Sequence, residues 1–214
     1  MIDLPELLAQ LAVQRPVFHS EDDFKFALAW LIQQTYPNYS VRLEYKPPFL
    51  ADRIYIDLWI KDGRRSYGIE MKYKTATLST TIGDEAFDLS DHNARDQARY
   101  DFLFDIQRLE SLVHANHEVV GSTIFLSNDR LFWEQPRNGD TVDTQFRIHD
   151  GREIHGELRW HERAAAGTIR DREMPINIRG NYTVSWSYFS KPSEDRNGLF
   201  QYALLDIRHD GHGR

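Results

Sequence analysis

The chain of 214 residues contains no cysteine. Disulfide bridges and thiolate zinc sites are therefore excluded, and cysteine pairing gives no information about the redox compartment. No apolar run approaches the roughly 20 residues that a membrane-spanning helix needs. Residues 1–6 carry acids and no basic start, so we expect no signal peptide, no membrane partner and a cytoplasmic protein.

The chain also lacks an excess of positive charge. It has 26 Lys and Arg against 33 Asp and Glu, which gives a net charge of −7. This balance disfavours a protein that merely coats nucleic acid, because phosphate binding needs clustered cations. It argues less strongly against a nuclease, because a metal site needs acidic ligands and only one face must be basic.

Several enzyme signatures are missing as well. The chain has no Gly-x-Ser-x-Gly elbow of the serine hydrolases and no glycine-rich phosphate loop. Its histidines show no recognised ligand spacing, so a histidine metal site is a poor explanation for them. His114 is better interpreted as a favourable residue at the end of a helix.

Hydrophobic periodicity predicts a mixture of helices and strands. The hydrophobic fraction, 41 %, is enough for a sizeable core. Predicted helices cover Leu4–Val13, a segment from Ser20 to before Pro37, and 92–114. Predicted strands cover Val41–Tyr45, Ile54–Ile60, Tyr67–Tyr73 and Val119–Leu126, with a polar loop over 75–91. Further on, we predict a hairpin within Arg147–Trp160 and strands over Tyr182–Phe189 and Phe200–Ile207.

This order of elements predicts an α/β (α+β) fold with a mixed central sheet flanked by helices. We divide the chain into a core over 1–129 and a β-rich C-terminal extension over 130–214 that packs on the same domain. In the long helix, Asp101, Asp105 and Arg108 are expected to form a solvated face or an internal ion-pair network.

Two carboxylates interrupt the apolar strands. Asp57 lies within Ile54–Ile60, and Glu70 lies in the next strand. In both strands the large aliphatic residues occupy the opposite face, so the two carboxylates share one face of an antiparallel pair. Neighbouring carboxylates repel each other unless a cation lies between them. A hard divalent ion such as Mg²⁺, or Mn²⁺ in its place, meets that requirement.

Lys72 follows Glu70 by two positions and therefore lies on the same strand face. Its ammonium can orient or help to deprotonate a metal-bound water, and it can stabilise the charge of a phosphate under attack. Phosphodiester hydrolysis needs these contributions. The carbonyl of Met71, between Glu70 and Lys72, is a further candidate metal ligand.

Asp57 on one strand and Glu70-Met71-Lys72 on the next resemble the signature of the PD-(D/E)XK, restriction-endonuclease-like nuclease superfamily. The acid-bearing helix start at residues 19–23 extends the resemblance, which covers roughly residues 19–127. Ile56 replaces the proline of the pattern, a change that the motif tolerates. The resemblance implies a restriction-endonuclease-like sheet and metal binding by Asp57, Glu70 and the carbonyl of Met71.

The superfamily also often adds a helix glutamate to the metal shell, directly or through water. Glu21 is the candidate for that role. It lies three residues before Phe24 and seven before Leu28, a spacing that puts it on the same buried face of the helix. Asp22 and Asp23 fit less well, and Asp23 is expected to act as the capping partner of Ser20.

We therefore expect a Mg²⁺-dependent nuclease that hydrolyses phosphodiester bonds, first of all in DNA and by endonucleolytic cleavage. Arg95 and Arg99 are four residues apart on one helix face and are candidate substrate contacts. Two alternatives remain open: a catalytically silent nuclease-fold binding or scaffold protein, and a hydrolase of another phosphodiester, RNA included. The oligomeric state, a homodimer included, and the substrate sequence are also open.

Blander explanations exist for each residue. A Glu-x-Lys pair on a strand is common on a solvated face. An aspartate within an apolar strand can protect an edge against aggregation. Glu21 can simply favour the positive end of the helix dipole. The order of these residues on compatible faces is what favours the metal site.

Overall fold

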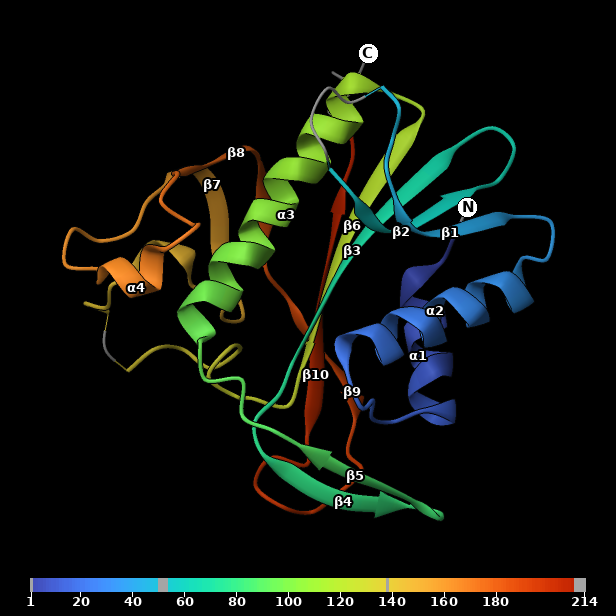
Figure 1. Ribbon diagram of the computed structural model, residues 1–214, viewed down its shortest axis with the longest axis horizontal. Helices are drawn as coiled ribbons and strands as arrows, with labels where there is room; N and C mark the ends of the chain where they lie inside the picture. Colours follow the sequence, from blue (N-terminus) through green and yellow to red (C-terminus); the bar gives the residue numbers. More distant parts are fainter. Residues whose placement is uncertain (1, 50–53, 138, 210–214) are drawn as a thin grey trace.

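A six-stranded sheet forms the centre of the computed structural model, which describes residues 2–49, 54–137 and 139–209 (Figure 1). The strand order is β1-β2-β3-β6-β10-β9. Neighbouring strands run antiparallel except β3 and β6, which are parallel. The bounds are β1 (Ser40–Tyr45), β2 (Ile56–Lys61), β3 (Ser66–Lys74), β6 (Val119–Ser127), β9 (Trp186–Ser190) and β10 (Phe200–Ile207).

Helices cover both faces of this sheet, as Figure 1 shows. On one face, α1 (Leu4–Gln14) and α2 (Glu21–Thr35) pack with the apolar side chains of β3 in one buried cluster. On the other face, α3 (Arg95–Ala115) packs on β6 through a second buried cluster. The predicted mixed sheet flanked by helices is therefore confirmed as a coarse fold class.

Helix α2 begins as the sequence predicts. The Ser20 side chain accepts a hydrogen bond from the Asp23 amide at 3.1 Å, which satisfies one of the free N–H groups of the first turn. The reciprocal bond differs from the prediction. The Asp23 carboxylate accepts the His19 amide at 3.0 Å and pairs with Arg15 at 2.8 Å, instead of bonding Ser20.

Strand β2 is shorter than predicted and its apolar residues divide between the two clusters. Leu58 and Ile60 pack beneath α2, but Ile56 packs with the α3 cluster. The prediction that Ile54, Ile56, Leu58 and Ile60 share one face is therefore wrong for the first part of this segment. The change occurs where β2 stops pairing with β3, because their register ends at Leu58 and Ile69.

The predicted polar loop over 75–91 is wrong. This segment contains a hairpin of β4 (Leu78–Ile82) and β5 (Glu85–Leu89), with Gly83 at φ +63° in the turn. Leu78, Phe87 and Leu89 are buried against the α1–α2 cluster. The many Ser, Thr and Asp residues between them occupy the exposed face and obscure the alternation.

The predicted local hairpin around Asp150 and Gly151 is also wrong. Gly151 has φ +76° and does form a turn, but β7 (Glu153–Leu158) pairs with the distant β8 (Ile176–Thr183). Between them lies the short helix α4 (Ala166–Ile169), and before them a 3-10 turn, η1 (Thr144–Phe146). Buried residues of this part, Phe146 and Ile178 among them, join the α3 cluster.

The last strands complete the central sheet. The predicted strand over Phe200–Ile207 is confirmed as β10, which pairs with β6. The predicted strand over Tyr182–Phe189 is in fact divided, because β8 ends at Thr183 and β9 begins at Trp186. No helix within the described ranges is long and apolar enough to cross a lipid bilayer.

Candidate active site

The edge of β3 becomes free where β2 leaves it. Beyond Ile69, no strand of the described chain pairs with this edge, and side-chain carboxylates accept its backbone hydrogen bonds instead. Asp57 accepts the Met71 amide at 2.7 Å, and Glu21 accepts the Tyr73 amide at 2.8 Å. Two predicted site residues thus cap successive outward amides. The carbonyl of Met71 faces the same edge, because the N–H and C=O of one strand residue point to the same side.

Glu70 and Lys72 point from β3 toward α3. Glu70 is only 3 % exposed and lies 3.0 Å from Arg108. Lys72 lies 2.5 Å from Asp105, and Arg108 also contacts Asp105 at 3.0 Å. Arg108 is further held by the carbonyl of Tyr55 at 2.5 Å. The internal ion-pair network considered for α3 is therefore present, and it meets the predicted site.

Lys25 of α2 is a third cation beside these carboxylates, and our sequence interpretation missed it. Its ammonium lies 3.2 Å from Asp57, 3.0 Å from Glu44 and 3.2 Å from Asp22. The side chain is only 11 % exposed. A lysine inside an otherwise apolar helix stripe was the available signal, because a buried ammonium needs carboxylate partners.

Burial and crowding shift the charges of this network. Burial raises the pKa of Glu70 well above its usual range, and the neighbouring Asp105 carboxylate raises it further. Burial also raises the pKa of Asp105, although Lys72 opposes that shift. Burial alone would lower the pKa of Lys72, but its carboxylate neighbours, Asp105 first, raise it overall. Lys72 is therefore a firmly protonated cation.

These side chains line an open cleft of about 570 Å³. Asp57, Glu70 and Lys72 are all in its wall, together with Arg108. Two partly exposed aromatic side chains, Tyr55 and Phe104, also line it. Predicted residues from two adjacent strands therefore meet in one solvent-accessible concavity.

Glu21 lies along the same β3 edge but outside the lining of this cleft. Its carboxylate is 2.9 Å from the Lys74 ammonium, and its side chain is 30 % exposed. Its charge acts on Lys72, whose pKa it helps to raise. Asp22 is more exposed, at 72 %, yet it shares the Lys25 ammonium with Asp57. The choice of Glu21 over Asp22 stays a prediction.

Arg95 and Arg99 lie elsewhere. Arg95 pairs with Asp129 and, at 2.7 Å, with Asp91. Arg99 is buried and bonds Asp143 at 2.7 Å. Both arginines line a separate pocket that shares no lining residue with the cleft. The structure therefore does not bring them together with Asp57 and Glu70.

The oxygen donors fit a hard cation chemically, but protein cations hold them. Asp57 contacts Lys25, and Glu70 contacts Arg108. Within the described ranges, no group of three or more His, Asp or Glu side chains is arranged to hold a metal ion. A divalent ion would have to exchange with these ammonium and guanidinium groups.

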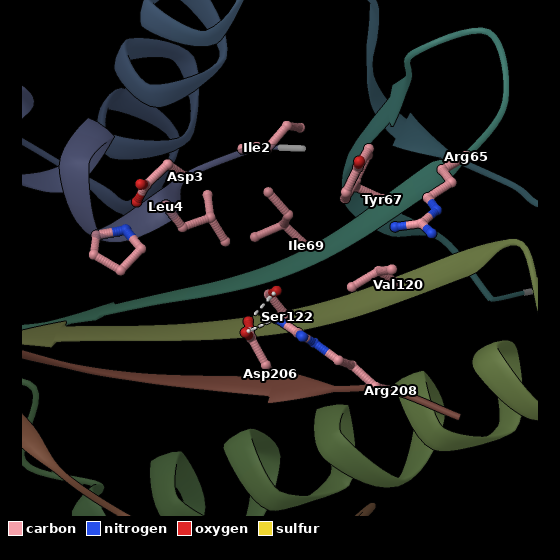
Figure 2. Close-up of a pocket in the computed structure, with 11 residues that line it drawn as sticks. Ile2, Asp3, Leu4, Arg65, Tyr67, Ile69, Val120, Ser122, Asp206 and Arg208 are labelled. Atoms are coloured by element: carbon pink, nitrogen blue, oxygen red, sulfur yellow. Dashed lines mark hydrogen bonds and ion pairs between the residues drawn. The ribbon is translucent and has the colours of Figure 1, made fainter. Parts of the chain in front are cut away.

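A smaller cavity, of about 330 Å³, lies beside the start of α1 and is drawn in Figure 2. The cavity and the cleft lie on opposite faces of β3. Ile69, in the wall of the cavity, packs in the α1–α2 cluster, whereas Glu70 and Lys72, in the wall of the cleft, point toward α3. Both acidic residues of the cavity already have partners: Asp206 is bonded to Ser122 at 3.0 Å and to Arg208 at 2.8 Å, and Asp3 accepts the Glu6 amide at 3.2 Å. Among the described residues, its lining includes neither a glutamate nor a lysine, so it does not reproduce the combination of Asp57, Glu70 and Lys72 in the cleft.

Comparisons with known proteins add no family to this geometry. No family model, no curated protein and no solved structure matches the chain. A function for the cleft therefore follows from its own residues.

Proposed function

We propose that the chain is a Mg²⁺-dependent nuclease that hydrolyses phosphodiester bonds, first of all in DNA, on a restriction-endonuclease-like scaffold. One observation carries the proposal: Asp57 of β2 and Glu70 and Lys72 of β3 line one open cleft. Their separation on two strands, with the aliphatic residues of β3 buried on its opposite face, supports a site rather than a solvated surface.

The donor set suits a hard cation. Asp57 and Glu70 would hold the ion with the Met71 carbonyl, and Glu21 would join through water, all with oxygen ligands. Burial is the main cause of the raised pKa of Glu70, and the neighbouring Asp105 carboxylate adds to it; a divalent ion would offset that added repulsion. When bound, Mg²⁺ activates a water molecule and stabilises charge on the phosphate.

Lys72 contributes a fixed positive charge. Asp105 holds its ammonium at 2.5 Å, and the raised pKa of Lys72 keeps the proton in place at neutral pH. The side chain therefore suits the orientation of the attacking water and the stabilisation of phosphate charge better than proton removal. Arg108 fixes the partner carboxylates, because it contacts both Asp105 and Glu70.

The same ion pairs favour the second candidate function, a catalytically silent binding or scaffold protein. Asp57, Glu70 and Asp105 each already have a protein cation within 3.2 Å. Because protein cations already compensate these carboxylates, the site has less electrostatic need of a metal. Hydrolysis of RNA by the same groups is the remaining alternative, because the chemistry at the phosphorus is shared.

A cleavage assay separates these candidates. The purified chain is incubated with double-stranded DNA, single-stranded DNA and RNA, in Mg²⁺ or Mn²⁺ and in EDTA. We expect metal-dependent cleavage of DNA that Asp57→Asn removes. Glu157→Gln is the matched control, because Glu157 is exposed and, among the described residues, forms an ion pair only with Arg159, two positions along the chain. Activity on RNA alone would reassign the substrate, and equal activity of Asp57→Asn and the wild type would refute the site.

A further inference from the structure

A second pocket is rich in guanidinium groups. It has a volume of about 390 Å³ and lies between the start of α3 and the segment 130–147. Its charged lining residues are Arg95, Arg99, Arg130, Glu134, Arg137 and Arg147. Five arginines around one concavity, with a single glutamate in the wall, are unusual in a chain whose net charge is −7.

Nearby carboxylates do not match these cations one for one. Arg95 has two carboxylate partners, Asp129 and, at 2.7 Å, Asp91, but a single carboxylate, Asp143, serves both Arg99, at 2.7 Å, and Arg147, at 3.1 Å. Arg130 pairs with Glu134 at 3.0 Å. The exposed Arg137 makes no ion pair within the described part of the chain.

The most buried guanidinium of this pocket, that of Arg99, lies close to another cation. The Arg99 side chain is 4 % exposed and lies over the Phe132 ring at 5.2 Å. Burial lowers the pKa of Arg99, and the neighbouring Arg147 lowers it further. The Nε atoms of Arg99 and Arg147 have no hydrogen-bond partner among the described residues. The positive charge of Arg99, Arg147 and Arg137 is therefore only partly compensated, because Asp143 is shared by the first two, and an anion would complete the compensation.

We infer that this pocket binds a phosphate group. The planar fork of arginine matches the oxygen atoms of phosphate in pairs, and several forks around one concavity suit a tetrahedral anion. The Thr141 hydroxyl, which also lines the pocket and bonds Arg147 at 2.9 Å, supplies a neutral donor. The site is independent of the proposed nuclease cleft, because the two share no lining residue.

Calorimetric titration with inorganic phosphate tests the inference, with chloride at equal ionic strength as the reference anion. The wild type should bind phosphate saturably. Arg137→Gln and Arg147→Gln should each weaken binding about tenfold, equivalent to about 1.4 kcal/mol. Arg159→Gln is the matched control, since it removes the same charge from an exposed residue outside the pocket and should bind like the wild type.

Arg137 is exposed, so its variant keeps the test decisive even if Arg147→Gln fails to fold. Absence of saturable phosphate binding by the wild type, or equal affinity of wild type and Arg137→Gln, would overturn the inference. Competition identifies the source of the phosphate. A short DNA strand that displaces inorganic phosphate only when it carries a 5′-phosphate indicates a nucleic-acid end, whereas no displacement by either strand indicates a free phosphate ligand.

Discussion

The Lys25 ammonium lies 3.2 Å from the Asp57 carboxylate, so a protein cation contacts the aspartate that a metal would need. The same ammonium contacts Glu44 at 3.0 Å. Its carboxylate partners, Asp57 first, raise the pKa of Lys25 although burial alone would lower it. Lys25 therefore acts as an internal counter-ion for this end of the cleft.

Replacement of Lys25 by methionine should have opposite effects on stability and metal affinity. Without the ammonium, Asp57 and Glu44 lose a shared partner, so the free energy of unfolding should fall by roughly 1–3 kcal/mol. Mn²⁺ affinity should rise, because the ion no longer competes with Lys25. Urea unfolding and calorimetry measure the two quantities. Lys191→Met, which removes an exposed partner of Glu194, is the control. Weaker Mn²⁺ binding by Lys25→Met would contradict the expectation.

Asp57→Asn and Lys72→Gln should separate metal binding from cleavage. Asp57 is expected to be a metal ligand, so its variant should lose both Mn²⁺ affinity and cleavage. Lys72 is expected to act on the phosphate, so its variant should still bind Mn²⁺ while cleavage falls roughly 100-fold or more. Titration calorimetry and a single-turnover assay on the same preparations provide the comparison. Loss of Mn²⁺ binding in Lys72→Gln would show that its role here is wrongly assigned.

The raised pKa of Glu70 predicts a pH dependence of stability in metal-free protein. An unfolded glutamate titrates near pH 4.3, at about its reference value. In the folded protein the pKa of Glu70 is higher. The contribution of its protonated form to stability is therefore complete below the unfolded pKa and is lost as pH rises through the folded pKa. Urea unfolding across a pH series should therefore show a decline that Glu70→Gln reduces. At neutral pH, Glu70→Gln should be more stable than the wild type by about 1 kcal/mol.

Metal binding should be linked to the same proton. A divalent ion needs the ionised carboxylate, so binding should release a proton from Glu70 and strengthen as pH rises. Calorimetry in two buffers with different heats of ionisation measures the number of protons released. An identical binding heat in both buffers would argue that Glu70 is not a ligand.

Arg99→Met should affect folding more than substrate affinity. Arg99 is buried and pairs with Asp143, so its loss should lower the free energy of unfolding by about 3 kcal/mol. The double variant Arg99→Met, Asp143→Leu should recover only part of that loss, because it removes the carboxylate that lost Arg99 but also deprives Arg147 of its partner at 3.1 Å. Urea unfolding of both variants tests this. A fully stable Arg99→Met that binds DNA weakly would restore the substrate role expected from the sequence.

Local pattern was sufficient for much of the fold. The Ser20 cap, the bounds of α1 and β10, and the buried stripe of α3 all follow from periodicity and capping within a few residues. The local sequence pattern did not predict the short strands in which polar and apolar residues are mixed. The β4–β5 hairpin and the long-range pairing of β7 with β8 depend on contacts that no local window contains.

The sequence by itself determined which charged residues interrupt the two apolar strands and that Glu70 and Lys72 share a strand face. Alternation within β3 puts Glu70 and Lys72 on one face, because strand periodicity is a local property, whereas Asp57 lies outside the β2–β3 register and reaches the same cleft only in the folded chain. Tertiary structure alone decided what surrounds them. Lys25 and Asp105 arrive from two helices on opposite sides of β3, and Arg99 is withdrawn into a separate arginine-lined pocket. Charges distant in sequence meet only after helices pack, and burial then determines which of them pair.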